Sequence, residues 1–248
     1  KSLRGQIRDG IEVVWIDDSG SGIGSSLMEK ARMGEIMVCN LSNRGIGFSR
    51  NLGLAVATGE YVVFLDVDDS LDLGNLGSLL GVVDESRPDI VQFHSEPFRR
   101  KGPNNGSELP VVRNIRFGPA PVMKMIWSRG FTPSSCMYVF RAAFLRANNL
   151  EFNERACFED YQFTFSALLK ARKYGDSLLN VHLRRVNAAS RTQTMSLAKK
   201  SRCYREVALW ALHQASYVPN WKTKAALVSI ASRATFFMVK NLSRSINR

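Results

Sequence analysis

Acidic side chains follow two apolar runs of the chain, and their types and spacing suit a metal and phosphate site. Residues 11–16 lead into Asp17 and Asp18, and residues 61–65 lead into Asp66-Val67-Asp68-Asp69. Carboxylates this close repel one another unless a cation joins them. Hard divalent ions such as Mg²⁺ or Mn²⁺ take carboxylate oxygens and share phosphate oxygens with a substrate. The clusters therefore predict a divalent cation and a phosphate-bearing ligand.

A solvated acidic turn is the alternative interpretation of the second cluster. Asp69 or Ser70 precedes a predicted helix that begins at Leu71, and either side chain suits a helix N-cap. The metal site is favoured because Asp17 and Asp18 end a second strand of the same predicted sheet.

Glu159 and Asp160 form a further acidic pair, at the start of a helix predicted over residues 159–173. The helix dipole favours carboxylates in the first turn, so capping is one interpretation. A carboxylate can also accept the proton of an attacking hydroxyl group, which is the second interpretation.

The elements that must position these residues alternate between strand and helix. Apolar runs predict strands, and longer stretches ended by glycine predict helices. The predicted strands are residues 11–16, 36–39, 61–65 and 90–93, and the predicted helices are residues 25–33, 49–57 and 71–83. This alternation predicts a parallel, doubly wound α/β sheet, which binds ligands at the carboxyl ends of its strands.

The second half of the chain is predicted to be mixed. A loop is expected over residues 98–118, a strand over 135–140 and a short helix over 142–147. The chain from Leu197 onward is expected to be helical.

Composition narrows the class of protein. The 248 residues, 45% hydrophobic and 23% charged, suffice for one large domain with or without a small appendage. The net charge of +12 suits nucleic acid, an anionic membrane or a phosphate-rich ligand. The signatures of nucleic-acid-binding modules are absent from the sequence, so no nucleic acid partner is expected. The first residues lack the apolar core of a signal peptide, which predicts a cytoplasmic protein.

The four cysteines, Cys39, Cys136, Cys157 and Cys203, are widely spaced and form no CxxC pair. They predict free thiols in a reducing cytosol rather than a disulfide framework or a zinc site.

Four segments, in order, resemble the motifs of the family 2 glycosyltransferases, the large inverting family with the GT-A fold. They are Glu12–Ser21, Asn43–Ala55, Ala57–Asp69 and Phe158–Phe163, which resemble the family's EIIVVDDGS, ARN-x-G, GEYI-x-FLDSDD and FEDxxF patterns. The resemblance implies a GT-A (Rossmann-like), mostly parallel sheet flanked by helices. The resemblance covers residues 1–195. These residues are expected to form the nucleotide-sugar-binding and catalytic domain, and residues 196–248 a helical extension.

The resemblance also implies roles in donor binding. Asp17 would contact the nucleotide base, usually uracil, with Asp18 nearby, and Arg50 would help to hold the base or a phosphate. Asp66 would touch the ribose or the metal, and Asp68 would bind the metal, Mn²⁺ or Mg²⁺.

The resemblance implies further roles for Phe158–Phe163 and for one additional segment, Arg184–Ser190. Asp160 would be the general base, with Glu159 beside it. Arg184–Ser190 resembles the family's YRVNPNS stretch, so Arg185 and Ser190 would close over the diphosphate. A solvated basic edge is the alternative interpretation of that stretch.

The implied function is an inverting, metal-assisted glycosyltransferase of the hexosyl- or N-acetylhexosaminyl-transferase class. Its donor is expected to be a UDP-sugar, and its acceptor a hydroxyl group of a glycan or lipid-linked molecule in polysaccharide biosynthesis. A non-catalytic relative that binds nucleotide or membrane is the alternative. A receiver-like signalling domain fits less well, because the chain is too long and lacks the expected pattern.

The sequence departs from the family pattern at its start. Lys1–Gln6 resembles the end of the helix that follows the family's first strand, so that strand is missing, and we expect a fragment of a longer protein. The usual serine between the metal aspartates is Val67, and the acid that closes the first motif is replaced by Gly22.

Residues 221–248 form an amphipathic stretch. A helix would align an apolar stripe and leave basic side chains outside it; the stripe is Leu227, Ile230, Ala234, Phe237 and Met238. A peripheral contact with an anionic membrane, at its inner face, is one interpretation. Packing on its own domain is the other.

Overall fold

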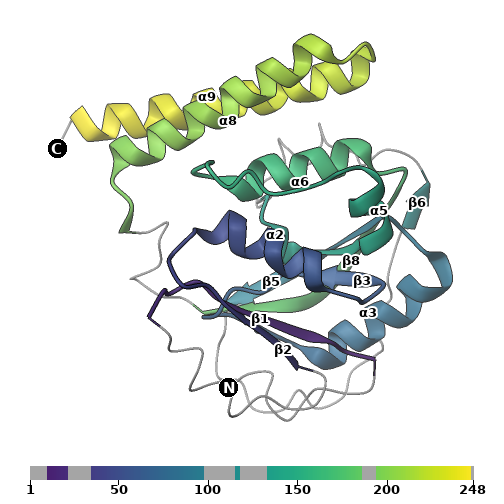
Figure 1. Ribbon diagram of the computed structural model, residues 1–248. Coiled ribbons are helices and arrows are strands. Elements are labelled where there is room, and N and C mark those ends of the chain that lie inside the picture. Colours follow the sequence, from purple (N-terminus) through teal and green to yellow (C-terminus); the bar gives the residue numbers. More distant parts are fainter. Residues whose placement is uncertain (1–9, 22–34, 98–114, 118–132, 186–193, 247–248) are drawn as a thin grey trace.

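The computed structural model describes residues 10–21, 35–97, 115–117, 133–185 and 194–246. A mixed sheet lies between helices, and a helical hairpin forms an outer layer beyond α6 (Figure 1). The α/β class with a helical C-terminal region is therefore confirmed.

The described strands form two sheets. The first pairs β1 (Val13–Asp17) with β2 (Glu35–Cys39) in parallel. The second has the order β3-β7-β5-β8-β4, with β6 also paired to β8. Its strands are β3 (Tyr61–Val63), β4 (Ser70–Leu71), β5 (Ile90–Pro97), β6 (Ile115–Phe117), β7 (Tyr138–Arg141) and β8 (Lys173–Arg184).

The strand directions differ from the parallel arrangement that the alternating pattern predicted. Parallel pairing joins β1 to β2 and β5 to β8, whereas β3–β7, β5–β7, β4–β8 and β6–β8 are antiparallel. The sheet is mixed because β7, from late in the chain, lies antiparallel between β3 and β5. Among the described strands, β1 pairs only with β2 and β3 only with β7, so each has an open edge.

Helices cover both faces of the larger sheet (Figure 1). On one side lie α2 (Ile46–Val56), α5 (Ala142–Ala147) and α6 (Glu159–Lys170), and on the other lies α3 (Leu73–Ser86). Alternate residues of β7 serve the two cores, because strand side chains alternate in direction. Tyr138 and Phe140 pack with the α6 side, and Val139 packs with the α3 side.

Most element boundaries fall within a few residues of their predictions, and three local points of the element assignment need correction. The strand β8 was not predicted, because exposed Leu178 between buried Ser177 and Leu179 hides its alternation. The predicted loop over 98–118 contains the short strand β6. The helix predicted over 25–33 lies outside the described residues.

The N-cap of α3 is the third correction. Asp72, not Asp69 or Ser70, caps the helix, since its side chain accepts a hydrogen bond from the backbone nitrogen of Asn75 at 2.9 Å. Ser70 belongs to β4. The capping alternative for Asp69 is therefore wrong, and its carboxylate has other partners.

The C-terminal hairpin consists of α8 (Leu197–Tyr217) and α9 (Trp221–Ile246), which pack along most of their lengths. In the predicted apolar stripe, Leu227, Ile230 and Ala234 are buried in the same core as α8 residues such as Val207 and Ala211. That stripe packs within the protein. Within the described ranges, no helix is both long and apolar enough to cross a membrane.

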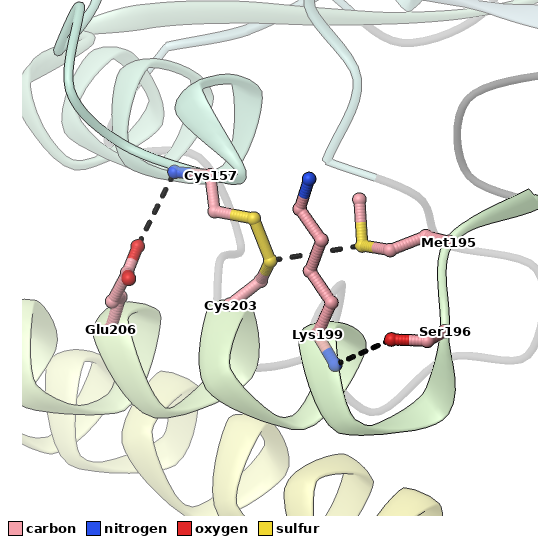
Figure 2. Close-up of a disulfide and its surroundings, with 6 residues drawn as sticks. All are labelled: Cys157, Met195, Ser196, Lys199, Cys203 and Glu206. Carbon is pink, nitrogen blue, oxygen red and sulfur yellow. Dashed lines mark hydrogen bonds between the residues drawn. A yellow bond between two sulfur atoms is a disulfide. The ribbon is translucent and has the colours of Figure 1, made fainter.

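A disulfide joins the hairpin to the segment that precedes α6. Cys157 and Cys203 are bonded, with their Cα atoms 5.2 Å apart, and Glu206 accepts a hydrogen bond from the backbone nitrogen of Cys157 (Figure 2). The prediction of free thiols is wrong for this pair, because cysteines distant in sequence meet in the fold. It holds for Cys39 and Cys136.

We predict that Cys203→Ser, or reduction, lowers the free energy of unfolding by about 2–4 kcal/mol, because the bond closes a long loop in the unfolded chain. Urea titration with and without dithiothreitol measures this difference. Cys39→Ser is the control and should behave like the parent protein. Reductant that leaves the unfolding midpoint of the parent protein unchanged would contradict the prediction.

Candidate active site

A buried guanidinium joins the two acidic regions that the sequence singled out. Arg50 on α2 donates through Nη2 to Oδ1 of Asp66 at 2.9 Å. Its Nη1 donates to Oε1 of Glu159 at 3.1 Å and to Oδ1 of Asp160 at 2.5 Å. The surrounding carboxylates hold the pKa of Arg50 above its ordinary value despite burial. One cation thus gathers carboxylates from the end of β3 and the start of α6.

Local contacts of α2 fix this arginine. The side chain of Asn51 brackets the backbone of Phe152, accepting from its nitrogen at 2.7 Å and donating to its oxygen at 2.9 Å. A Cβ at Gly47 would lie 3.1 Å from the Cα of Glu154, so a glycine permits the close approach of the helix. Gly47 and Asn51 thus hold α2 against residues 152–154, and this contact fixes the position of Arg50 on the same helix.

A cluster of packed aromatic rings lies beside Arg50. Phe152 and Phe163 stack with centroids 3.9 Å apart, and Phe64 meets both rings edge-on. The guanidinium of Arg50 lies 5.3 Å from the ring of Phe152. Aromatic pairs of this kind each contribute about 0.5–1.5 kcal/mol beyond their buried area. The cluster ties β3, which leads into the acidic turn, to α6.

Asp160 has the environment of a proton acceptor. Its Oδ1 also accepts a hydrogen bond from Oγ of Ser135 at 2.7 Å. Burial raises its pKa, Arg50 and Ser135 lower it, and Glu159 and Asp66 raise it, with a net pKa of about 6. A carboxyl group with this pKa is mostly ionised at neutral pH and is a better base than an ordinary aspartate.

The acidic run forms a tight turn rather than the start of a helix. The backbone nitrogen of Asp69 donates to the oxygen of Asp66 at 3.0 Å, which leaves Val67 exposed at the tip. Asp68 is half-buried, and its carboxylate has no partner among the described residues. It is the carboxylate of the run most available to a ligand.

Asp69 links this turn to the end of β8. Its Oδ1 accepts from the backbone nitrogen of Arg185 at 2.8 Å, and its Oδ2 lies 3.0 Å from Nε2 of His182. That second distance is within ion-pair range but lacks hydrogen-bond geometry. His182 is buried, and its Nδ1 pairs with Oγ of Ser95 at 2.9 Å. The backbone of Arg185, an exposed residue, is thereby placed beside the acidic turn.

Asp17, the last residue of β1, and Asp18, the next residue, both form hydrogen bonds with loop backbone. Oδ1 of Asp17 accepts from the backbone nitrogen of Ser19 at 2.9 Å. The carboxylate of Asp18 accepts from the backbone nitrogens of Arg44 and Gly45 at 2.8 and 2.7 Å, and from Asn40. Partial burial would raise the pKa of Asp18, but these hydrogen bonds outweigh it and lower the pKa.

The loop that Asp18 holds leads directly into α2. Gly45 lies five residues before Arg50, a separation of roughly 8 Å along a helix axis. Gly45 itself has a φ of 91°, which favours glycine. The two acidic clusters predicted to act together are thus connected through one helix.

The carboxylate oxygens of the acidic turn are of the kind that a divalent cation such as Mg²⁺ or Mn²⁺ binds. Among the described residues, no group of three or more histidine, cysteine or acidic side chains is arranged to hold a metal. Magnesium and manganese often use only one or two carboxylates, with phosphate and water oxygens for the rest. Asp68, together with the free oxygen of Asp66, meets that lesser requirement.

Ser135 and Asn51 are the contacts that sequence reasoning missed. Ser135 precedes a strand and carries no motif signal. Asn51 adjoins Arg50 inside the quoted Arg-Asn segment, so its motif position was the available signal. Ser190, predicted to close over the diphosphate, lies outside the described residues.

Comparisons with known proteins identify the family. The model of the family described as "Glycosyl transferase family 2" matches residues 1–146, and this chain belongs to that family. It is 29% identical over 166 residues to the poly(ribitol-phosphate) beta-N-acetylglucosaminyltransferase TarS of Staphylococcus aureus, covering 65% of this chain and 28% of TarS. It is 25% identical over 178 residues to the putative glycosyltransferase EpsH of Bacillus subtilis, covering 69% of this chain and 51% of EpsH.

Solved structures support the same fold. TarS residues 1–349 in complex with UDP-GlcNAc superimpose with a TM-score of 0.68 at 22% identity, covering 92% of this chain and 64% of that one. A mannosyltransferase of Pyrobaculum calidifontis, in complex with GDP-Man and Mn²⁺, gives 0.62 at 18% identity, covering 98% and 68%. The fold is GT-A. The chain spans between about a quarter and a half of the length of TarS and EpsH.

We predict that Arg50→Ala lowers the free energy of unfolding by about 3 kcal/mol at neutral pH, because it leaves buried carboxylates without their cation. The deficit should shrink as the pH falls from 7 to 5, since protonation of Asp160 then relieves the repulsion. Thermal and urea unfolding across this range measures both effects.

Arg44→Ala is the matched control, because Arg44 lies two residues before the same helix but is exposed and stacks on Phe48 at 3.9 Å. It should change stability by less than about 1 kcal/mol. Equal and pH-independent losses in the two variants would contradict the role given to Arg50.

Proposed function

We propose that this chain is the catalytic region of a glycosyltransferase that moves a sugar from a nucleoside-diphosphate donor, expected to be a UDP-sugar, to an acceptor hydroxyl group. The observation that carries the proposal is the bridge from Arg50 to Asp66 on one side and to Asp160 on the other. Arg50 thereby connects Asp66, the proposed contact to the donor, with Asp160, the proposed acceptor of the hydroxyl proton.

Asp160 is the proposed general base. A sugar transferred in one displacement needs a group that accepts the proton of the acceptor hydroxyl as its oxygen attacks the anomeric carbon. The bond between that carbon and the diphosphate oxygen breaks, the electron pair leaves with the diphosphate, and the configuration inverts. A positioned base contributes typically about 10²–10⁴-fold in rate. Ser135 and Arg50 orient the carboxylate, and buried Glu159 helps to keep its pKa raised.

The acidic turn is the proposed donor site. Asp68 would bind a divalent cation, Mn²⁺ or Mg²⁺, and Asp66 would share it or contact the ribose. Such a cation, when bound, stabilises the negative charge of the leaving diphosphate. The backbone of Arg185 is held next to this turn, and its exposed guanidinium, whose fork geometry suits phosphate oxygens, would contact the diphosphate.

The predicted nucleotide contacts differ in how much support they have. Asp17 is half-buried at the end of β1 and stays the proposed contact to the base. Asp18 is proposed to act indirectly, because its carboxylate already holds the loop before α2. Arg50 is likewise proposed to orient carboxylates rather than to bind the base or a phosphate.

The donor and acceptor classes follow by similarity. TarS is named an N-acetylglucosaminyltransferase and has been solved with UDP-GlcNAc, which supports a hexosyl- or N-acetylhexosaminyl-transferase here. The acceptor is proposed to be a glycan or lipid-linked molecule of a polysaccharide pathway, in the cytoplasm. Residues 1–195 would form the catalytic domain and 196–248 the helical extension.

The proposal is tested by incubating the protein, with any flanking residues of its gene product, with a panel of nucleotide sugars and Mn²⁺. We expect release of nucleoside diphosphate that requires metal. Asp160→Asn should reduce kcat at least about 10²-fold with donor binding retained, because it removes only the base. In the parent protein, kcat/KM should rise with pH through about 6 and then level off, as Asp160 loses its proton.

A second pair of variants separates the donor site from the base. Asp68→Asn should weaken metal-dependent UDP binding, measured by calorimetry, whereas Asp84→Asn, at an exposed position of α3, should not. Turnover that survives Asp160→Asn would contradict the assigned base. Metal-dependent UDP binding without turnover of any donor would favour the non-catalytic relative.

A further inference from the structure

The C-terminal hairpin carries a second apolar face, distinct from the stripe that packs within the protein. On α9 the side chains of Trp221 and Phe236 are 72% and 60% exposed. Further large apolar side chains are exposed along both helices; they are Val228, Val239 and Leu242 on α9, and Leu209, Leu212 and Tyr217 on α8. No other part of the described chain exposes so many large apolar side chains together.

Helix geometry gathers the α9 members of this set. Trp221, Val228 and Val239 are 7 and 11 residues apart in sequence, which places them on one face of an α-helix. Phe236 and Leu242 flank this line. The buried residues Leu227, Ile230 and Ala234 lie on the opposite face and pack against α8. The exposed face therefore is not needed to hold the hairpin together.

The charge around this face has one sign. The stretch 221–248 has six basic residues and no Asp or Glu; the basic ones are Lys222, Lys224, Arg233, Lys240, Arg244 and Arg248. Lys222 and Lys240 are exposed and adjoin Trp221 and Val239. Within the described residues, no ion pair engages the lysines of α9. A partner of this face must bury apolar side chains and carry negative charge.

We propose that this face of α9 docks peripherally on an anionic lipid bilayer. An interfacial helix has this combination of buried apolar side chains and flanking basic groups, with a Trp near the water boundary. The 26 residues of α9 make a rod of about 39 Å. Lying flat, it can embed its exposed apolar face while its buried face stays packed on α8.

Docking would hold the candidate site near the lipid surface. The disulfide joins α8 to Cys157, two residues before Glu159. Tyr204 of α8 also packs edge-on against Phe158 and stacks on Phe237 of α9, with centroids 5.0 and 5.3 Å apart. These contacts connect the proposed lipid face to the start of α6 through packed side chains.

Vesicle flotation tests the proposal without requiring turnover, so its failure is distinct from failure of the proposed function. We expect the protein to bind vesicles of equal parts phosphatidylglycerol and phosphatidylcholine, and to bind phosphatidylcholine alone at least about ten-fold more weakly. High salt should weaken the anionic binding.

Two variants probe the apolar and basic contributions. The double variant Trp221→Ser with Phe236→Ser should reduce binding about ten-fold or more, since it removes two large inserted side chains. The triple variant Lys222→Gln, Lys224→Gln and Lys240→Gln should remove the preference for anionic vesicles. All five residues are exposed, so the fold should persist, and circular dichroism checks this.

Matched controls lie elsewhere on the surface. Leu178→Ser removes an exposed leucine of β8 and Arg172→Gln removes an exposed arginine before it, and neither should alter vesicle binding. Absence of binding to anionic vesicles, or equal effects of the control variants, would overturn the proposal. So would a dimer in light scattering that the double variant disrupts, because the face would then belong to a second copy of the chain.

Discussion

The buried guanidinium of Arg50 is the interaction on which the rest of the site depends. A cation removed from water needs anions, and carboxylates gathered at one place need a cation. Arg50 meets both needs, because it contacts Asp66, Glu159 and Asp160 at once. Three elements far apart in sequence, α2, the turn after β3 and the start of α6, must therefore come together for any of these charges to be tolerated.

The same contacts of Arg50 determine the pKa of Asp160. Burial alone would leave Asp160 protonated well above its ordinary pKa, and an exposed aspartate would be a weak base. The balance between burial and Arg50 brings the pKa to about 6, where the group is ionised at neutral pH and still accepts a proton effectively. Because Arg50 also contacts Asp66, a change in the charge at the acidic turn would be felt at Asp160.

Local patterns in the sequence predicted the parts of this arrangement that depend on local physics. Apolar runs, helix periodicity and motif order predicted most strands and helices, and the motifs identified Arg50, Asp66 and Asp160. They assigned Arg50 to a ligand, because a sequence does not show that its charge is already balanced by three carboxylates. Strand direction and β8 were also missed, since β7 and β8 come from late in the chain and pair with strands formed much earlier.

The disulfide and the second apolar face show the same limit. The spacing of Cys157 and Cys203 carries no signal, and only the packing of α8 beside the start of α6 brings them together. The amphipathic pattern of 221–248 was visible in the sequence. Which side of the helix faces α8 was decided by tertiary packing, and that choice leaves Trp221 and Phe236 outward.

The coupling between Arg50 and Asp160 is tested most directly by titration of the Asp160 carboxyl carbon with carbon-13 NMR, assigned with Asp160→Asn. We expect an inflection near pH 6, moved upward in Arg50→Gln, because burial is then no longer opposed by the guanidinium. An inflection near the ordinary aspartate value of about 4, unchanged in that variant, would contradict this coupling.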